Sequence, residues 1–285
     1  MTHALDRKAA VGGLVTSLEE ISLKVHDKSS GRIARAIRRA RELGPLKLLD
    51  LARRHGIKGS LQFALGNVRH IAADRFARRW DCRHGVNTSG SIQLSSLTID
   101  SPNKAFGNEC LCISPNTFDF VVESLPGDLS SYTFIDFGAG KSRTLLLASR
   151  FNFAKIAGVE FAKELVEYSK HNLRHFKAEW QRCHNLEILE ADATEYIVPA
   201  TPLVLFFYNP FKREVFVQVL NNILTSLDNT KRDCFIVYCS SSHNAIDWAR
   251  SLILDSGRFE EIPTQPMPMF LDTVRAVRFG VFRAV

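Results

Sequence analysis

Thr133-Phe134-Ile135-Asp136-Phe137-Gly138-Ala139-Gly140-Lys141-Ser142 is the stretch of sequence that decides the fold. It is an apolar run that ends at an acid and turns through two glycines, and a segment of helical character, 143–150, follows directly. The first N–H groups of such a helix lack intrahelical partners, so they and the positive helix end face whatever binds at the turn. The stretch therefore predicts a cofactor site at the end of a strand.

The spacing of this turn distinguishes three nucleotide cofactors. A Walker loop needs a glycine five residues before Gly140, but Ile135 stands there. A dinucleotide fingerprint needs a third glycine where Arg143 stands. S-adenosylmethionine (SAM) needs neither of these glycines. It needs a second acid after the next strand, because a carboxylate accepts hydrogen bonds from both ribose hydroxyls. Glu160, which ends the apolar run 155–160, supplies that acid.

Four motifs occur in order, and with them the chain from about 131 to 285 resembles the class I SAM-dependent methyltransferase superfamily. The resemblance is closest to an uncharacterised bacterial branch of that superfamily, and a fainter one is to histone-lysine methyltransferases that lack a SET domain. The motifs are Asp136-x-Gly138-x-Gly140, Gly158-Val159-Glu160, Ala191-Asp192-Ala193 and Tyr208-Asn209-Pro210-Phe211.

Apolar runs separated by segments of helical period predict an α/β fold with a parallel sheet covered on both faces. The last two runs follow one another without a helix, so we expect them to form a hairpin. The resemblance implies the class I methyltransferase (Rossmann-like) fold, a seven-stranded mixed sheet with helices on both faces. Apolar residues at three- and four-residue spacing before residue 83 predict an N-terminal helical segment in addition. The predicted strands are 133–137, 155–160, 186–190, 203–208, 233–239, 258–263 and 274–284.

The charge distribution suggests how the chain is divided. Residues 1–90 hold 18 Lys and Arg against 8 Asp and Glu, whereas the rest is slightly acidic. We predict a basic helical N-terminal cap at 1–83, a loop or lid with a lead-in helix at 84–130, and the SAM-binding methyltransferase domain at 131–285. The basic helices could bind nucleic acid or another acidic partner, or they could simply present a solvated arginine-rich face.

The resemblance implies a set of cofactor-binding residues at the strand ends. Glu160 is expected to bind the ribose. Asp136 would hold the amino acid end of the cofactor or stabilise the next helix, and Asp192 would accept from the adenine amino group or cap a helix. Lys141 could meet the cofactor carboxylate, and Asn103 and Thr117 are further candidates by resemblance. The full predicted set is Asp136, Gly138, Gly140, Glu160, Asp192, Ala193 and Asn209.

The catalytic residues predicted are Asn209, Tyr208 and Phe211. Their motif resembles the Asn/Asp-Pro-Pro-aromatic motif of amino methyltransferases with one proline missing, which shifts the aromatic by one position. An Asn carbonyl at a proline-fixed turn can orient an acceptor for in-line displacement, with Phe211 packed against the substrate. A structural turn is the other interpretation. His243, after the fifth strand, is a weaker candidate for a general base.

The composition sets limits on the remaining possibilities. The sequence has no run of eighteen apolar residues and no secretory signal, so we expect a cytoplasmic protein. Its six cysteines are too scattered for a disulfide framework or a zinc site, and we predict no metal. The predicted function is SAM-dependent methyl transfer to an unidentified N or O acceptor, a protein lysine or a small molecule. The alternatives are a NAD-type Rossmann oxidoreductase and a catalytically inactive SAM-binding protein.

Overall fold

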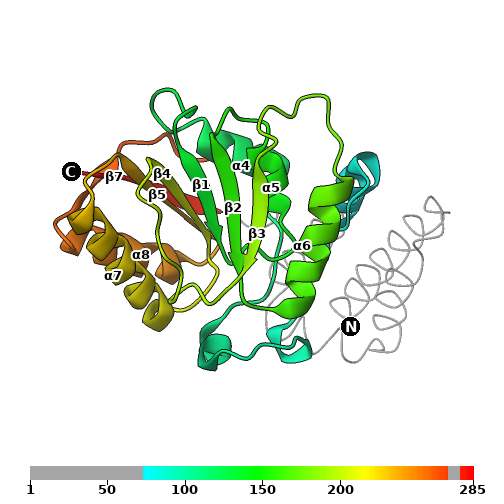
Figure 1. The fold of residues 1–285 in the computed structure, drawn as a ribbon, viewed down its shortest axis with the longest axis horizontal. Coiled ribbons are helices and arrows are strands. Elements are labelled where there is room, and N and C mark those ends of the chain that lie inside the picture. The colour runs from blue at the N-terminus through cyan, green and yellow to red at the C-terminus, as the bar shows by residue number, and fades with distance from the viewer. Residues whose placement is uncertain (1–72, 269–276) are drawn as a thin grey trace, which may run out of the picture. The chain divides into compact units, whose positions relative to one another are not determined.

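The computed structural model describes residues 73–268 and 277–285. The predicted basic helices before residue 73 lie outside the described residues. Seven strands form one sheet (Figure 1), and the first four coincide with the predicted apolar runs. The strands are β1 (Thr133–Phe137), β2 (Lys155–Glu160), β3 (Leu186–Glu190), β4 (Leu203–Tyr208), β5 (Cys234–Ser240), β6 (Phe259–Ile262) and β7 (Arg278–Ala284).

The strand order is β3-β2-β1-β4-β5-β7-β6. Strands β1 to β5 pair in parallel, whereas β7 is antiparallel to both β5 and β6. The chain order reverses between β1 and β4, and in open α/β sheets such a switch point opens a crevice at the carboxyl ends of the strands. This arrangement confirms the predicted fold class, including the terminal hairpin.

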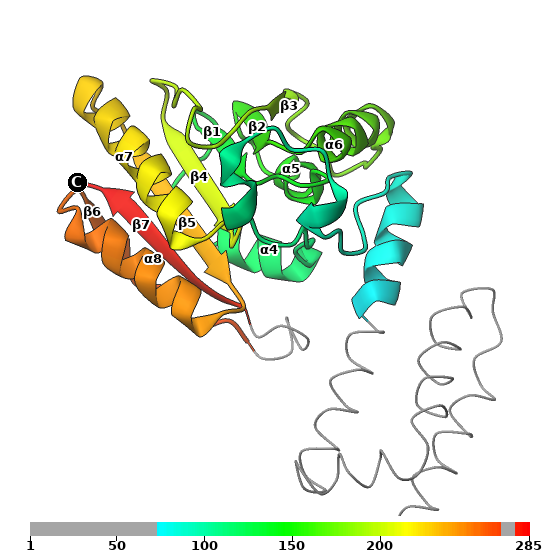
Figure 2. The ribbon, with the colours of Figure 1, turned by 90° about the horizontal axis from the view of Figure 1, so that it is seen from below.

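Helices cover both faces of the sheet because the central strands are apolar on both sides. Successive residues of β1 alternate, so Phe134 packs with α4 and α5 while Ile135 and Phe137 pack with α7 and α8. In Figure 1, α7 and α8 lie beside β4 and β5, and Figure 2 shows the same layers from below. The helices are α4 (Pro115–Val122), α5 (Arg143–Ala148), α6 (Lys163–His175), α7 (Arg213–Asn229) and α8 (His243–Asp255).

The stretch between the helical residues 73–84 and α4 carries only two short 3-10 helices, η1 (Leu94–Ser96) and η2 (Pro102–Phe106). It is nevertheless joined to the sheet, through a bridge from Gly107 to Phe211 and a hydrogen bond from Thr98 to the α6 residue Glu164. The lead-in helix α4 begins at Pro115, within the segment 84–130 where the sequence predicted a helix, and the Ser114 side chain caps it. Within 73–268 and 277–285, every helix is too short or too polar to span a bilayer.

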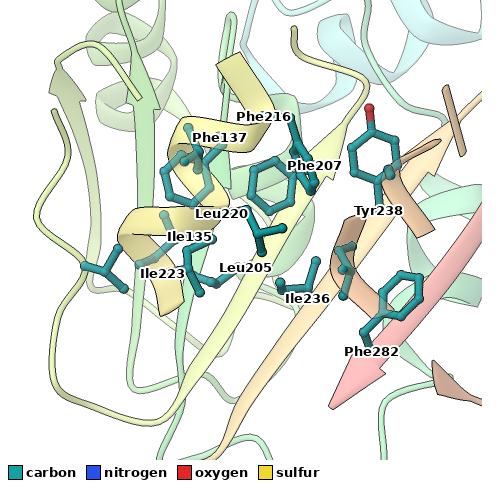
Figure 3. Close-up of a cluster of buried hydrophobic side chains, with 14 of the residues drawn as sticks. Ile135, Phe137, Leu205, Phe207, Phe216, Leu220, Ile223, Ile236, Tyr238 and Phe282 are labelled. Atoms are coloured by element: carbon teal, nitrogen blue, oxygen red, sulfur yellow. The ribbon is translucent and has the colours of Figure 1, made fainter. Parts of the chain in front are cut away.

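Aromatic side chains fill the core between the sheet and α7 (Figure 3). The rings of Phe137 and Phe207 stack with centroids 4.9 Å apart, and Phe216 and Tyr238 meet Phe207 from α7 and β5. Phe207 is fully buried at the centre of this cluster. The cluster fixes β1 against β4, and the predicted site lies directly beyond the ends of these two strands.

We expect Phe207→Ala to lower the free energy of unfolding by about 3–5 kcal/mol, because it removes a buried ring and leaves a cavity. Ile197→Ala is the matched control, since its side chain is 88% exposed, and we expect a change within about 0.5 kcal/mol. Urea unfolding of both variants measures the difference. Equal losses would show that this cluster does not stabilise the sheet.

Candidate functional site

One cavity lies beyond the carboxyl ends of β1, β2 and β4, at the switch point of the sheet. Its lining includes the full predicted cofactor-binding set and the three predicted catalytic residues, drawn from four separate strand ends. The segment 107–112 contributes a further wall that the sequence did not predict. The tertiary structure thus gathers the four motifs at one place.

The two glycines of the first turn have left-handed backbones, with φ of 76° at Gly138 and 56° at Gly140. A Cβ at Gly138 would lie 2.4 Å from Cβ of Pro210, and one at Gly140 would lie 2.7 Å from the Cys110 sulfur. Both values are far below a normal contact, so only glycine fits. The requirement for glycine thus also comes from Pro210 and Cys110, which pack against the turn. The sequence alone does not predict these two neighbours.

The carboxylate of Glu160 points at the glycine turn. One oxygen accepts from the Gly140 N–H at 2.8 Å, and the other accepts from the N–H groups of Phe161 and Ala162, each at 3.0 Å. Burial raises the pKa of this carboxyl group, and the three N–H donors oppose that rise. A carboxylate has about four acceptor sites, so acceptor capacity remains for a ligand hydroxyl.

Asp136 lies at the end of β1 and is almost fully buried. Burial raises its pKa well above the ordinary value for an aspartate, although a hydrogen bond from the Thr144 side chain acts in the opposite direction. Thr144 belongs to the first turn of α5. Asp136 therefore both faces the cavity and contacts the start of the helix, so the two interpretations of this residue are compatible.

Asp192 follows β3 and binds the loop at residues 101–103, which precedes α4 in the chain. Its carboxylate accepts hydrogen bonds from the hydroxyl of Ser101 and the amide of Asn103, and also from the N–H and hydroxyl of Thr194 at 2.8 and 2.7 Å. Burial alone would raise its pKa, but these donors outweigh burial and lower it. No helix begins at Asp192, so it caps a turn and anchors η2 over the cavity, next to Ala193.

The turn after β4 is held by both β5 and the segment 107–112. Asn209 has φ of 46°, and its side-chain oxygen accepts from the Tyr238 hydroxyl at 3.5 Å. Asn108 donates its backbone N–H to the Pro210 carbonyl and its side-chain amide to the Asn209 carbonyl, both at 3.0 Å. Phe211 is buried against Phe207, while Tyr208 and Asn209 remain partly exposed at the cavity.

Arg143 occupies the position where a dinucleotide fingerprint has its third glycine, and it is buried. It forms an ion pair with Asp81 at 2.8 Å, donates to the Thr88 hydroxyl and lies 4.5 Å from the ring centre of Trp80. Asp81 also accepts from the N–H groups of Thr88 and Ser89. This buried pair fastens the helical residues 73–84 and the following loop to the start of α5.

Two further contacts fasten the same loop to the glycine turn. Lys141 donates to the Ser89 carbonyl at 2.7 Å, and burial lowers its pKa. Asn172 of α6 is fully buried, and it exchanges hydrogen bonds with the backbone of Asn87 while donating to the Lys141 carbonyl. The Lys141 ammonium thus already has hydrogen-bond partners within the chain, and in this structure it is not an unpaired cation available to a cofactor carboxylate.

One candidate lies elsewhere. Thr117 is buried in α4 and does not line the cavity. His243 is the first residue of α8. The residues that sequence reasoning missed are those of 107–112 and the pair of Arg143 with Asp81. A buried arginine beside a glycine turn requires an acidic partner, but the sequence alone does not identify which acid it is.

No protein-family profile matches the chain, and no curated protein matches it. Among solved structures, it is similar to a protein of the NADB-Rossmann superfamily from Streptococcus agalactiae, at 14% identity over 61% of this chain and 69% of that one, with a TM-score of 0.45. A precorrin-6y C5,15-methyltransferase from Geobacter metallireducens has 16% identity over 68% of this chain and 97% of that one, with a TM-score of 0.44. A putative methyltransferase complexed with SAH has 10% identity over 60% of this chain and 50% of that one, also with a TM-score of 0.44.

The sheet itself decides the architecture. Its seven strands form a mixed sheet with a terminal hairpin, as the sequence resemblance implied, and β7 lies antiparallel between β5 and β6. The chain has the class I methyltransferase fold. In this Rossmann-like fold, the glycine turn after β1 and the acid after β2 face each other across the crevice, as the contact between Gly140 and Glu160 shows.

We expect Arg143→Ala to destabilise the protein by about 3 kcal/mol, because it leaves Asp81 buried without its cation. Arg250→Ala is the matched control, because its ion pair with Glu261 is partly exposed and should contribute about 0–1 kcal/mol. Chemical denaturation of the three proteins gives the comparison. A loss for Arg143→Ala as small as the control's would contradict a structural role for the buried pair.

The raised pKa of Asp136 predicts a pH dependence of stability. The folded protein binds this proton more tightly than the unfolded chain, so stability falls as pH rises from the unfolded value of about 3.8 through the folded pKa. The Asp136→Asn variant has no carboxyl group to ionise at this position, so its free energy of unfolding does not fall for this reason. Its stability relative to the original chain should therefore increase as pH rises through that window. Asp128→Asn should show the opposite trend, since hydrogen bonds from Ser130 lower the pKa of Asp128. The window for Asp128 lies mainly below its unfolded value of about 3.8, so unfolding measured from about pH 2 to pH 8 tests both, and a flat difference for Asp136→Asn would contradict the prediction.

Proposed function

We propose that this chain is a SAM-dependent methyltransferase that transfers a methyl group to a nitrogen or oxygen acceptor. The observation that carries the proposal is the Glu160 carboxylate at the end of β2, held by the Gly140 N–H at the switch point of the sheet. A strand-end acid of this kind suits the two hydroxyls of a ribose. The antiparallel β7 and the buried Arg143 disfavour the NAD-type oxidoreductase.

The residues present fit the cofactor. When bound, SAM supplies a methyl group activated by a sulfonium. Glu160 keeps acceptor capacity for the ribose, and Asp136 offers a carboxyl group for the amino acid end. Asp192 and Ala193 lie on the adenine side, with Asp192 already orienting η2. These assignments follow the order of the strand ends along the crevice, with Asp136 at β1, Glu160 at β2 and Asp192 after β3.

Methyl transfer asks the protein mainly to align and desolvate the acceptor. Tyr208 and Asn209 line the cavity from the turn after β4, and the hydroxyl of Tyr238 together with Asn108 fixes the orientation of Asn209. The segment 84–130 shapes the acceptor side in this proposal, because its residues 107–112 form a wall of the same cavity. Burial raises the pKa of Cys110 in that wall to about 12, so it stays a neutral thiol beside Gly140.

Calorimetric titration with S-adenosylhomocysteine (SAH) tests the proposal. We expect Glu160→Gln to weaken binding about tenfold or more, because hydrogen bonds to a charged acceptor contribute about 1.5–3 kcal/mol each. Glu187→Gln is the matched control on the neighbouring strand; its side chain is half exposed, pairs with Lys155 and does not line the cavity. Circular dichroism verifies that each variant is folded. Absence of SAH binding by the folded original chain, or equal binding by Glu160→Gln, would overturn the proposal.

A further inference from the structure

A second hollow adjoins the cofactor cavity and opens beside the turn after β4. Five of its six lining residues also line the cavity, so it is the mouth of that cavity and not a separate pocket. An acceptor that approaches Tyr208 and Asn209 from solvent can enter there without crossing the glycine turn. The lining residues are Asn108, Glu109, Leu111, Tyr208, Asn209 and Ser241.

The segment 108–112 presents two different faces because it is extended. Cys110 exchanges backbone hydrogen bonds with Ile92, and its sulfur lies over Gly140. In an extended chain successive side chains point to opposite sides. Glu109 and Leu111 are accordingly exposed and line the mouth, whereas the Cys110 side chain lies inward. The carboxylate and the aliphatic side chain of this outer face are thus adjacent.

The charges around the cavity make Glu109 distinctive. The two lining cations are already paired, Lys141 with the loop at 87–89 and Arg143 with Asp81. The carboxylates of Asp136, Glu160 and Asp192 accept hydrogen bonds from their own neighbours. Among the lining residues that the structure describes, Glu109 is the carboxylate that makes neither a hydrogen bond nor an ion pair within 73–268 and 277–285. Within the part of the chain that the structure describes, the mouth therefore presents one carboxylate without an internal partner beside apolar surface.

We propose, on the basis of the function proposed above, that Glu109 and Leu111 select an acceptor that carries a primary amine on an apolar stem. The amine is cationic at neutral pH and is attracted to the carboxylate, while the stem packs on Leu111 and Tyr208. The acceptor nitrogen then lies on the same side of the cavity as Asn209. An anionic acceptor, such as a phosphate-bearing one, is repelled by the same charge.

The test uses SAH and two analogues in which a nitrogen replaces the sulfur and carries a short alkyl chain toward the mouth. In one analogue the chain ends in an ammonium group, and in the other it ends in a methyl group; chains of three to five carbons are compared. We expect the original chain to bind the ammonium analogue about tenfold more tightly than its methyl partner. We expect Glu109→Gln to lose this preference while its affinity for SAH is unchanged.

Glu123→Gln changes an exposed acid at the C-terminal end of α4 that lines neither hollow; it is the matched control and should keep the preference. A preference that persists in Glu109→Gln, or none in the original chain, overturns the inference. Binding of SAH but of neither analogue also overturns it, because the mouth would then not admit the chain. If SAH itself fails to bind, the proposed function fails, and the two failures are thereby distinguished.

Discussion

The hydrogen bond from the Gly140 N–H to the Glu160 carboxylate is the contact on which the site depends. It joins the turn after β1 to the turn after β2, and it uses an N–H that no helix satisfies. Both groups are buried, so each would be costly to leave without a partner. The bond therefore fixes the distance between the two strand ends between which a nucleoside would lie. The Ser169 hydroxyl of α6 donates a hydrogen bond to the Gly140 carbonyl, so the carbonyl group of this glycine is held as well as its N–H.

The rest of the cavity is built by segments that come from outside the sheet. The loop after residue 84 is fastened to the glycine turn by Lys141 and Asn172, η2 is fastened to β3 by Asp192, and 107–112 is fastened to the turn after β4 by Asn108. Each fastening uses a buried or partly buried polar side chain that bonds to backbone or loop groups. Because such groups are costly when unpaired, the loop has few alternative positions of similar free energy. The segment 87–112 thus belongs to the site and is not merely a connection to it.

The electrostatics of the cavity follow from this burial. Asp136, Glu160 and Cys110 all lie in a poorly solvated space, and burial is the largest cause of the raised pKa of each. Asp192 differs because four donors surround it, so its charge is retained although it is partly buried. A positively charged ligand at the first two carboxyl groups would favour their ionised forms, which links ligand binding to proton release. The fully buried Asn172 and Ser169 show that neutral polar groups hold the glycine turn behind the cavity without adding charge.

The sequence by itself determined the sheet and the identity of the strand-end residues. Runs such as 133–137 and 203–208 are mainly apolar, because central parallel strands are covered on both faces, and that pattern is local. The motif order likewise placed Gly138, Gly140, Glu160 and Asn209 at strand ends, where the topology brings them to one cavity. Only the tertiary structure decided which partners these residues have. Asp81 meets Arg143 across 62 positions and Ser101 meets Asp192 across 91, and no local pattern in the sequence links the members of either pair. A buried charge reveals that it needs a partner, but the fold alone selects that partner, because many acids and hydroxyls satisfy the same chemistry.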